Sequence, residues 1–259
     1  MLAPSLVLPP SVAGVTPPWH TIFEILAFAG GFRLFLALRR RQGDTIAEPA
    51  RIVITIAAAI GALLGARALG VLERPELFAL ARAGELRELL LAKTIVGGLL
   101  GGLVAVEWIK RRLKVRRSSG DLLVAPLLLG MALGRIGCFL SGVHDGTHGS
   151  PTTAWTALDL GDGIGRHPTA LYELVFLLGL GALLLAVERR VTLADGGRFK
   201  LFLAAYLAFR LGIEALKPRA ELLAGLSAIQ LACLGGLVYY RRLFYAPRRE
   251  LLARSADDA

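Results

Sequence analysis

The stretch Gly134-Arg135-Ile136-Gly137-Cys138-Phe139-Leu140-Ser141-Gly142-Val143-His144-Asp145-Gly146 begins inside a long apolar run and ends in a polar loop. An arginine at the centre of an apolar membrane helix costs roughly 2.5–3.5 kcal/mol on insertion scales, so Arg135 needs a compensating environment. The glycines around it allow other groups to approach the backbone closely. We therefore expect a functional site here, with an interfacial arginine that reaches water as the alternative.

The composition of the chain is that of a membrane protein. Hydrophobic residues make up 55% of the 259 residues, and the mean hydropathy of +0.60 exceeds that of ordinary soluble domains. The net charge of +10 lies mostly in short clusters between apolar runs, as in positively charged cytoplasmic loops. Aromatic residues amount to 7% and no nucleic-acid motif is present, which excludes nucleic acid as a partner. Cys138 and Cys233 lie in or beside apolar runs and predict no disulfide.

Apolar runs of about 20 residues are long enough to cross a bilayer, and they predict an all-α, polytopic membrane protein with about seven transmembrane helices. The expected spans are residues 19–38, 52–72, 94–109, 122–140, 168–187, 199–216 and 222–240. Arginine and lysine clusters follow the first, third, fifth and seventh spans, so we expect the N-terminus outside and the C-terminus in the cytoplasm.

The predicted spans divide the chain into three parts. Residues 1–18 form an extracytoplasmic N-terminal segment, residues 19–242 a seven-helix transmembrane domain, and residues 243–259 a cytoplasmic tail. Within the domain, residues 141–167 form a long extracytoplasmic loop. Residues 72–93 predict an amphipathic helix that lies on the outer membrane surface.

Ionisable residues fall inside or at the ends of these spans: Glu24, Arg33, Arg67, Arg135, Arg210 and Glu214. Unpaired, they would together cost about ten kcal/mol or more, so we expect them to face one another or a wet cavity. Arg210 and Glu214 are four residues apart on one helix face and can pair, and Tyr206 lies one turn earlier. Because a guanidinium matches phosphate oxygens, this stripe predicts a phospholipid-headgroup pocket, with a purely structural ion pair as the alternative.

The long loop holds three of the four histidines of the chain, His144, His148 and His167. Histidine titrates near neutral pH and can act as a general base. The stretch His144-Asp145-Gly146-Thr147-His148 could instead be half of a zinc site, but its ligand set is incomplete, so we expect no metal and no cofactor. We expect Cys138 to be a buried, inert thiol, with a reactive thiol beside Arg135 as the alternative.

Glycines recur at the four-residue spacing that is typical of closely packed membrane helices. The pairs are Gly61 and Gly65, Gly97 and Gly101, Gly98 and Gly102, and Gly130 and Gly134. Close helix packing is the expected role of these glycines, and Gly97 and Gly98 are set apart as candidates for a binding site.

Taken together, the motifs resemble the bacterial prolipoprotein diacylglyceryl transferases. The resemblance rests on Gly134-Arg135-Ile136-Gly137-x-Phe139-x-x-Gly142, Arg166-His167-Pro168-Thr169-Ala170-Leu171-Tyr172-Glu173, Tyr206-x-x-Phe209-Arg210-x-x-x-Glu214, and Trp19-His20 at the start of the first span. It covers roughly residues 19–242, and the two long motifs in this order are specific to the family.

The resemblance implies a transferase in the bacterial inner (plasma) membrane. Such enzymes move the diacylglyceryl group of phosphatidylglycerol onto the lipobox cysteine thiol of a preprolipoprotein, so that a thioether forms and glycerol 1-phosphate leaves. The implied partners are phosphatidylglycerol, membrane lipid and the signal peptide that carries the lipobox cysteine. Arg135 and Arg210 would hold the lipid phosphate, and Tyr206 and Glu214 would support them. The other implied substrate contacts are Gly97, Gly98, Gly142, Gly146 and Arg166.

The chain departs from the family pattern at four positions. The family usually has Asn, Glu, His and Tyr where this chain has Cys138, Val143, Val96 and His20. The phosphate-binding arginines are therefore kept, whereas several proton-handling positions are not. His20, His144 and His167 are the candidates for the general base. The alternative function is a catalytically altered or inactive paralogue that binds phospholipid or lipoprotein, or transfers lipid to a different acceptor.

Overall fold

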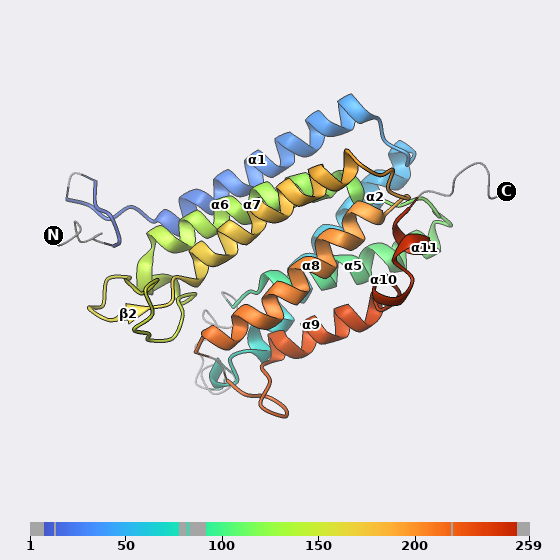
Figure 1. Ribbon diagram of the computed structural model, residues 1–259. Helices are drawn as coiled ribbons and strands as arrows, with labels where there is room; N and C mark the ends of the chain where they lie inside the picture. The colour runs from blue at the N-terminus through green and yellow to red at the C-terminus, as the bar shows by residue number, and fades with distance from the viewer. Residues whose placement is uncertain (1–7, 13, 78–81, 83–91, 219, 253–259) are drawn as a thin grey trace. The chain divides into compact units, whose positions relative to one another are not determined.

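The computed structural model describes residues 8–12, 14–77, 82, 92–218 and 220–252, and these residues are mostly helical (Figure 1). The chain divides into two compact units, each assembled from separate stretches of sequence. Unit 1 comprises residues 1–42, 122–190 and 215–218, and unit 2 comprises residues 43–121, 191–214 and 219–259.

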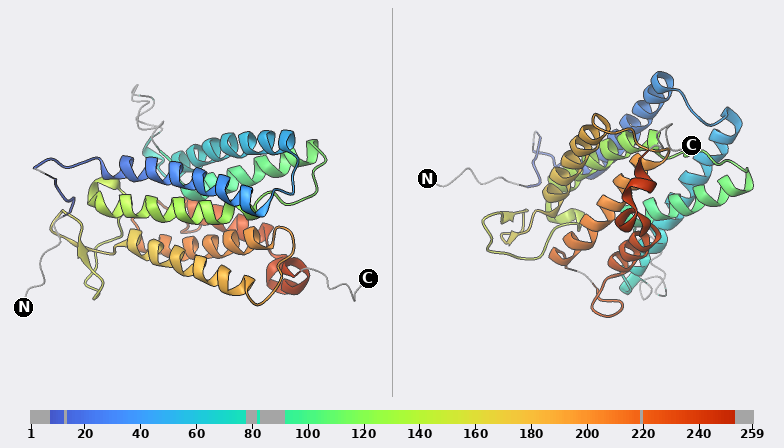
Figure 2. Two further views of the ribbon diagram at one scale, coloured as in Figure 1. Left: turned by 90° about the horizontal axis from the view of Figure 1, so that it is seen from above. Right: turned by 45° about the vertical axis from the view of Figure 1, so that its right-hand side comes forward.

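Three long helices form unit 1: α1 (Trp19–Gln42), α6 (Val124–Leu140) and α7 (Thr169–Glu188). Helix α6 packs against both α1 and α7, and both views of Figure 2 show α1 and α6 side by side. A Cβ on Gly137 of α6 would lie only 2.6 Å from the Cβ of Phe23 of α1, so glycine permits this close approach. A 3₁₀ helix (Gly142–Asp145) follows α6, and the loop before α7 contains the antiparallel strands β1 (Leu158–Asp159) and β2 (Gly165–Arg166).

Unit 2 is built from the helices α2 (Glu48–Leu72), α5 (Ile95–Arg112), α8 (Gly197–Ile213), α9 (Ala228–Tyr239), α10 (Arg242–Tyr245) and α11 (Pro247–Leu251). Helix α2 packs against α5, helix α8 packs against α9, and α9 also contacts α2 and α5. The core of this unit includes Phe202, Leu203, Tyr206 and Leu207 of α8, which are all 0% exposed.

Glycines bring the backbones of α2 and α5 into direct contact. A Cβ on Gly61 would lie 2.5 Å from the carbonyl oxygen of Gly101, and a Cβ on Gly65 would lie 2.8 Å from the Cα of Gly101. Gly97 meets the backbone of Gly65 in the same way. The predicted close packing at the glycines of α2 and α5 is therefore confirmed.

Replacing Gly65 by valine is expected to destabilise unit 2 by about 1–3 kcal/mol, because the new side chain would overlap the backbone of α5. Thermal unfolding in detergent, followed by near-ultraviolet circular dichroism, measures the loss. The matched control is Gly235→Ala on α9, where a Cβ would meet nothing within 4 Å. We expect the control to retain or slightly raise the Tm, since alanine is the better helix former. Equal Tm values for the two variants would contradict the packing argument.

Among the described residues, four helical segments are long and apolar enough to cross a membrane: Trp19–Gln42, Glu48–Leu72, Asp121–Leu140 and Thr169–Glu188. Their exposed side chains include Phe28, Phe32, Ile56, Ile60 and Leu178. Extended apolar surface of this kind is unfavourable in water and is typical of contact with lipid. The chain is therefore an all-α membrane protein.

Six of the seven stretches predicted as spans coincide with the helices α1, α2, α5, α6, α7 and α8 to within about one helical turn. Four of these helices are the ones long and apolar enough to cross a membrane. The seventh prediction was wrong at its start, because α9 begins at Ala228 and not at residue 222. A turn with positive φ at Ala224 and Gly225 precedes the helix. Ser227 then caps it by accepting a hydrogen bond from the Gln230 amide. The predicted amphipathic helix at residues 72–93 lies largely outside the described residues.

Candidate functional site

Arg135 lies near the C-terminal end of α6, with only 6% of its surface exposed. Its Nε is 3.0 Å from a carboxylate oxygen of Glu173, near the start of α7. Glu173 is 0% exposed, so the two charges compensate each other where a lone charge would be costly. The alternative of an interfacial arginine that reaches water is therefore wrong. The Nη1 of Arg135 also donates a hydrogen bond to Sγ of Cys138, at 3.6 Å.

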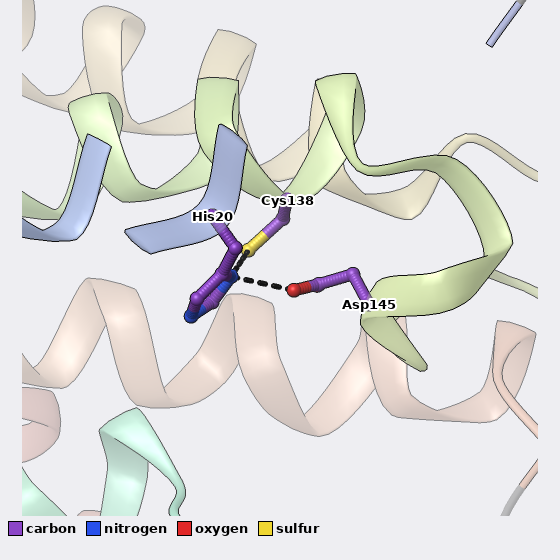
Figure 3. A group of neighbouring side chains, drawn as sticks. All are labelled: His20, Cys138 and Asp145. Carbon is purple, nitrogen blue, oxygen red and sulfur yellow. Dashed lines mark hydrogen bonds and ion pairs between the residues drawn. The ribbon is translucent and has the colours of Figure 1, made fainter. Parts of the chain in front are cut away.

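Beside this pair, the side chains of His20, Cys138 and Asp145 converge (Figure 3). They come from the start of α1, the last turn of α6 and the 3₁₀ helix that follows it. His20 Nδ1 lies 2.5 Å from Asp145 Oδ1 and 3.9 Å from Cys138 Sγ. Burial alone would raise the pKa of Asp145, but hydrogen bonds from His20 and Thr147 outweigh it and lower the pKa to about 2. The Asp145 carboxylate is therefore ionised at neutral pH.

Two glycines shape the loop that presents Asp145. Gly142 and Gly146 stand at the two ends of the 3₁₀ helix with φ of +61° and +66°, a left-handed conformation that favours glycine. A side chain on Gly142 would collide with the carbonyl oxygen of Leu160. The same oxygen accepts a hydrogen bond from the Val143 amide. Backbone geometry thus explains both glycines, and their contact with substrate stays a prediction.

The other predicted loop residues make different contacts. His144 is exposed, and Nδ1 of His167 lies 3.3 Å from the Tyr172 hydroxyl. Arg166 binds Asp162 through both Nε (2.8 Å) and Nη2 (2.7 Å), and its hydrogen bond holds the pKa of the Asp162 carboxyl below its usual value. The structure therefore brings only His20, of the three candidate bases, into contact with an ionised carboxylate and a thiol.

In unit 2, Arg210 and Tyr206 of α8 and Glu214 just after it are all buried. Arg210 Nη2 donates a hydrogen bond to Glu214 Oε2 at 2.6 Å, which confirms the predicted pairing four residues apart. Glu73, directly after α2, accepts a hydrogen bond from the Ile229 amide at 2.9 Å. Burial raises the pKa of Glu73, and the charges of Glu214 and Arg210 also act on it. Arg210 thus pairs with Glu214, and its charge also acts on Glu73.

Gly97 and Gly98 occupy the first turn of α5, where the Gly97 amide donates a hydrogen bond to the hydroxyl of the capping residue Thr94. Gly97 is in contact with α2, and a Cβ on Gly98 would lie 3.6 Å from the carbonyl oxygen of Ala62. Helix packing accounts for the small size of Gly97. A role of either glycine in substrate binding stays a prediction.

The sequence did not single out Glu173 and Asp145 as site residues. Glu173 does carry a signal in the sequence, because an acidic residue inside a predicted membrane span indicates a buried charge that needs a partner. Asp145 was considered only together with His144 and His148, because its partner His20 lies more than a hundred residues away in the chain. Cys138 is buried and unbridged, as predicted, but it contacts both Arg135 and His20.

Comparison with known proteins gives a consistent result. The chain matches the family model of prolipoprotein diacylglyceryl transferase over residues 11–245. It is 26% identical over 232 residues to the phosphatidylglycerol–prolipoprotein diacylglyceryl transferase of one strain of Dehalococcoides mccartyi, covering 85% of each chain. For another strain the identity is 32% over 143 residues, with 53% of this chain and 54% of the relative covered. The protein of the same name from Geobacter sulfurreducens is 32% identical over 220 residues, with 79% of each chain covered.

Proposed function

Because this chain belongs to the prolipoprotein diacylglyceryl transferase family, we propose that it moves the diacylglyceryl group of phosphatidylglycerol onto the lipobox cysteine thiol of a preprolipoprotein. The observation that carries the proposal is the family match over residues 11–245, a range that contains both buried arginines and their glutamate partners. The names of the relatives specify phosphatidylglycerol and prolipoprotein as substrates. The family match favours this transferase over a non-catalytic lipid-binding protein.

The proposed location is the bacterial inner membrane, with seven spans, the N-terminus outside and the C-terminus in the cytoplasm. Basic residues in the last turns of α1 and α5 support this orientation, since such clusters favour the cytoplasmic side. The start of α1 and the end of α6 then face outward. His20 and Arg135, which lie near these ends, would meet a preprolipoprotein on the outer side of the membrane.

In the proposed reaction, the acceptor sulfur attacks the glyceryl carbon of the lipid. The carbon–sulfur bond forms, the carbon–oxygen bond to phosphate breaks, and the electron pair stays on the oxygen of the departing glycerol 1-phosphate. Arg135 and Arg210 are proposed to bind the phosphate and stabilise this charge. Glu173 and Glu214 fix the guanidinium groups, with Tyr206 beside Arg210. The proposed substrate contacts are Gly97, Gly98, Gly142, Gly146 and Arg166.

The acceptor thiol must lose its proton, because the thiolate is the nucleophile. His20, His144 and His167 remain the histidine candidates for this step. His20 is the best supported, because it contacts Asp145 and Cys138 next to Arg135.

The purified protein in mixed micelles is expected to transfer radiolabel from the diacylglyceryl group of phosphatidylglycerol to a lipobox peptide. An equal amount of glycerol 1-phosphate should be released, because each transfer breaks one carbon–oxygen bond. A peptide with serine in place of the cysteine serves as the control and should remain unlabelled. Folded protein that binds the lipid without labelling the cysteine peptide would contradict the transferase and support the non-catalytic alternative.

A further inference from the structure

The donor atoms of His20, Cys138 and Asp145 surround one point in unit 1 (Figure 3). A ring nitrogen, a sulfur and a carboxylate oxygen all lie within 4.8 Å of one another. Zinc bonds of about 2.0–2.3 Å in tetrahedral geometry place ligand atoms roughly 3.3–3.8 Å apart. The nitrogen–sulfur distance is 3.9 Å and the nitrogen–oxygen distance is 2.5 Å. The nitrogen–sulfur distance is thus close to that of a shared ion, whereas the nitrogen and the carboxylate oxygen would have to move apart by roughly 1 Å to admit one.

The geometry does not fit a proton relay of the Cys–His–Asp kind. In such a relay the nucleophile and the carboxylate use opposite nitrogens of the imidazole ring. Here Nδ1 of His20 faces both Asp145 and Cys138. Because Nδ1 faces both partners, all three donor atoms are within reach of a single ion.

Further contacts hold the three side chains as metal ligands are commonly held. The other ring nitrogen of His20, Nε2, lies 3.7 Å from a carboxylate oxygen of Glu24. An ion at Nδ1 would take the place of the proton that Nδ1 gives to Asp145, while the Glu24 carboxylate would keep a proton on Nε2. Thr147 donates a hydrogen bond to the second oxygen of Asp145, at 2.5 Å. Arg135 donates one to the Cys138 sulfur, at 3.6 Å, which holds the sulfur beside the other two donor atoms.

We propose that His20, Cys138 and Asp145 bind a zinc-type divalent cation whose fourth position receives the acceptor thiol. The thiolate among the ligands favours zinc over magnesium or calcium. Three protein ligands with one open position are typical of catalytic rather than structural zinc sites. The His20 side chain is 37% exposed, so the site is accessible from that side. The expectation of no metal considered only the stretch from His144 to His148, and it did not foresee that Asp145 lies beside His20 and Cys138.

The proposed ion deepens the proposed function and rests on it. A thiol bound to such an ion gives its proton to solvent, and its sulfur then attacks the glyceryl carbon. The carbon–oxygen bond breaks, and the electron pair leaves on the phosphate oxygen beside Arg135. Two of the positions that depart from the family pattern, His20 and Cys138, are thus ligands of one site. The ion would then activate the acceptor thiol in place of a general base, and His20 would act as a ligand of the ion and not as that base.

Cobalt(II), added to full-length protein that a chelator has stripped of metal, is the direct probe. We expect one equivalent to bind, with a near-ultraviolet charge-transfer band from thiolate to cobalt and the visible bands of tetrahedral coordination. Added zinc should displace the cobalt and remove the bands. Wild-type protein without a charge-transfer band would overturn the proposal, and this measurement does not depend on the folding of any variant.

Variants of the three side chains test which of them bind the metal ion. Cys138→Ser should lose the charge-transfer band, and His20→Ala and Asp145→Asn should bind cobalt at least about tenfold more weakly. The matched control is Cys233→Ser, which removes the buried thiol of unit 2 and should leave the band unchanged. A band that survives Cys138→Ser and disappears in Cys233→Ser would overturn the assignment.

Measurements of transfer activity distinguish the proposed metal site from the proposed transferase function. Metal-free wild-type protein should lose transfer to the cysteine peptide and regain it with one equivalent of zinc. Full transfer by metal-free protein would overturn the metal inference and leave the transferase standing. Stoichiometric cobalt binding through Cys138, with no transfer under any metal condition, would support the metal site and overturn the proposed function.

Discussion

Replacing Arg135 or Arg210 by alanine is expected to lower the rate of diacylglyceryl transfer by about 10²–10³-fold or more. Each guanidinium is held by a carboxylate, Arg135 by Glu173 and Arg210 by Glu214, and is therefore preorganised for the charge that develops on the leaving phosphate. Loss of one such donor commonly costs this much in turnover. Initial rates with radiolabelled phosphatidylglycerol and a saturating cysteine peptide measure the effect.

The matched control is Arg33→Ala, which removes an exposed arginine from α1 and should leave the rate unchanged. The alanine variants also leave a buried glutamate without its cation, so lysine variants are needed as well. Arg135→Lys keeps the charge but loses the planar fork that matches phosphate oxygens. We expect it to insert and fold while remaining at least tenfold slower. Equal rates in Arg135→Lys and Arg33→Ala would contradict the role of Arg135.

Glu173→Gln is expected to lower the free energy of unfolding by about 3–5 kcal/mol. The substitution keeps the size of the side chain but leaves the positive charge of Arg135 buried without its carboxylate, which is costly in a low-dielectric interior. Both partners are shielded from solvent, with side-chain exposures of 7% and 1%. Reversible unfolding in detergent, followed by near-ultraviolet circular dichroism, is the measurement.

An ion pair with one exposed partner provides the comparison for this result. Glu107 lies 3.3 Å from Lys110 with its side chain 36% exposed, so Glu107→Gln should change stability by no more than about 1 kcal/mol. A double variant that replaces both Arg135 and Glu173 by leucine should recover much of the stability lost in Glu173→Gln, yet remain inactive. If Glu173→Gln is as stable as Glu107→Gln, the buried pair does not stabilise unit 1 as argued.

The features that the sequence predicted correctly are local ones. Apolar runs define a helix through consecutive residues, so most of the expected helices lie where predicted. Arg210 and Glu214 pair because a helix brings residues four apart onto one face. The glycines that join α2 to α5 were likewise visible as a spacing of four residues within each helix.

The features that the sequence did not predict depend on contacts between distant segments or on turn geometry. The partner of Arg135 is a glutamate on another helix, 38 positions further along the chain. The cluster of His20, Cys138 and Asp145 requires the packing of α1 on α6 and the return of the loop at Gly146. Helix α9 begins only at Ala228 because the backbone turns at Ala224 and Gly225. The leucines on either side of this turn belong to an apolar run, so the sequence predicted that the helix begins earlier.

The division of the chain into discontinuous units has a consequence for its synthesis. Residues 43–121 of unit 2 are translated between α1 and its packing partner α6. At elongation rates of about 5–20 residues per second, α1 waits roughly 4–16 s in the membrane before α6 emerges. During that interval α2 and α5 can already pair, whereas His20 is in place well before Cys138 and Asp145 have been made. Unit 2 therefore begins to assemble cotranslationally, and the proposed metal site is completed only after the ribosome has passed residue 145.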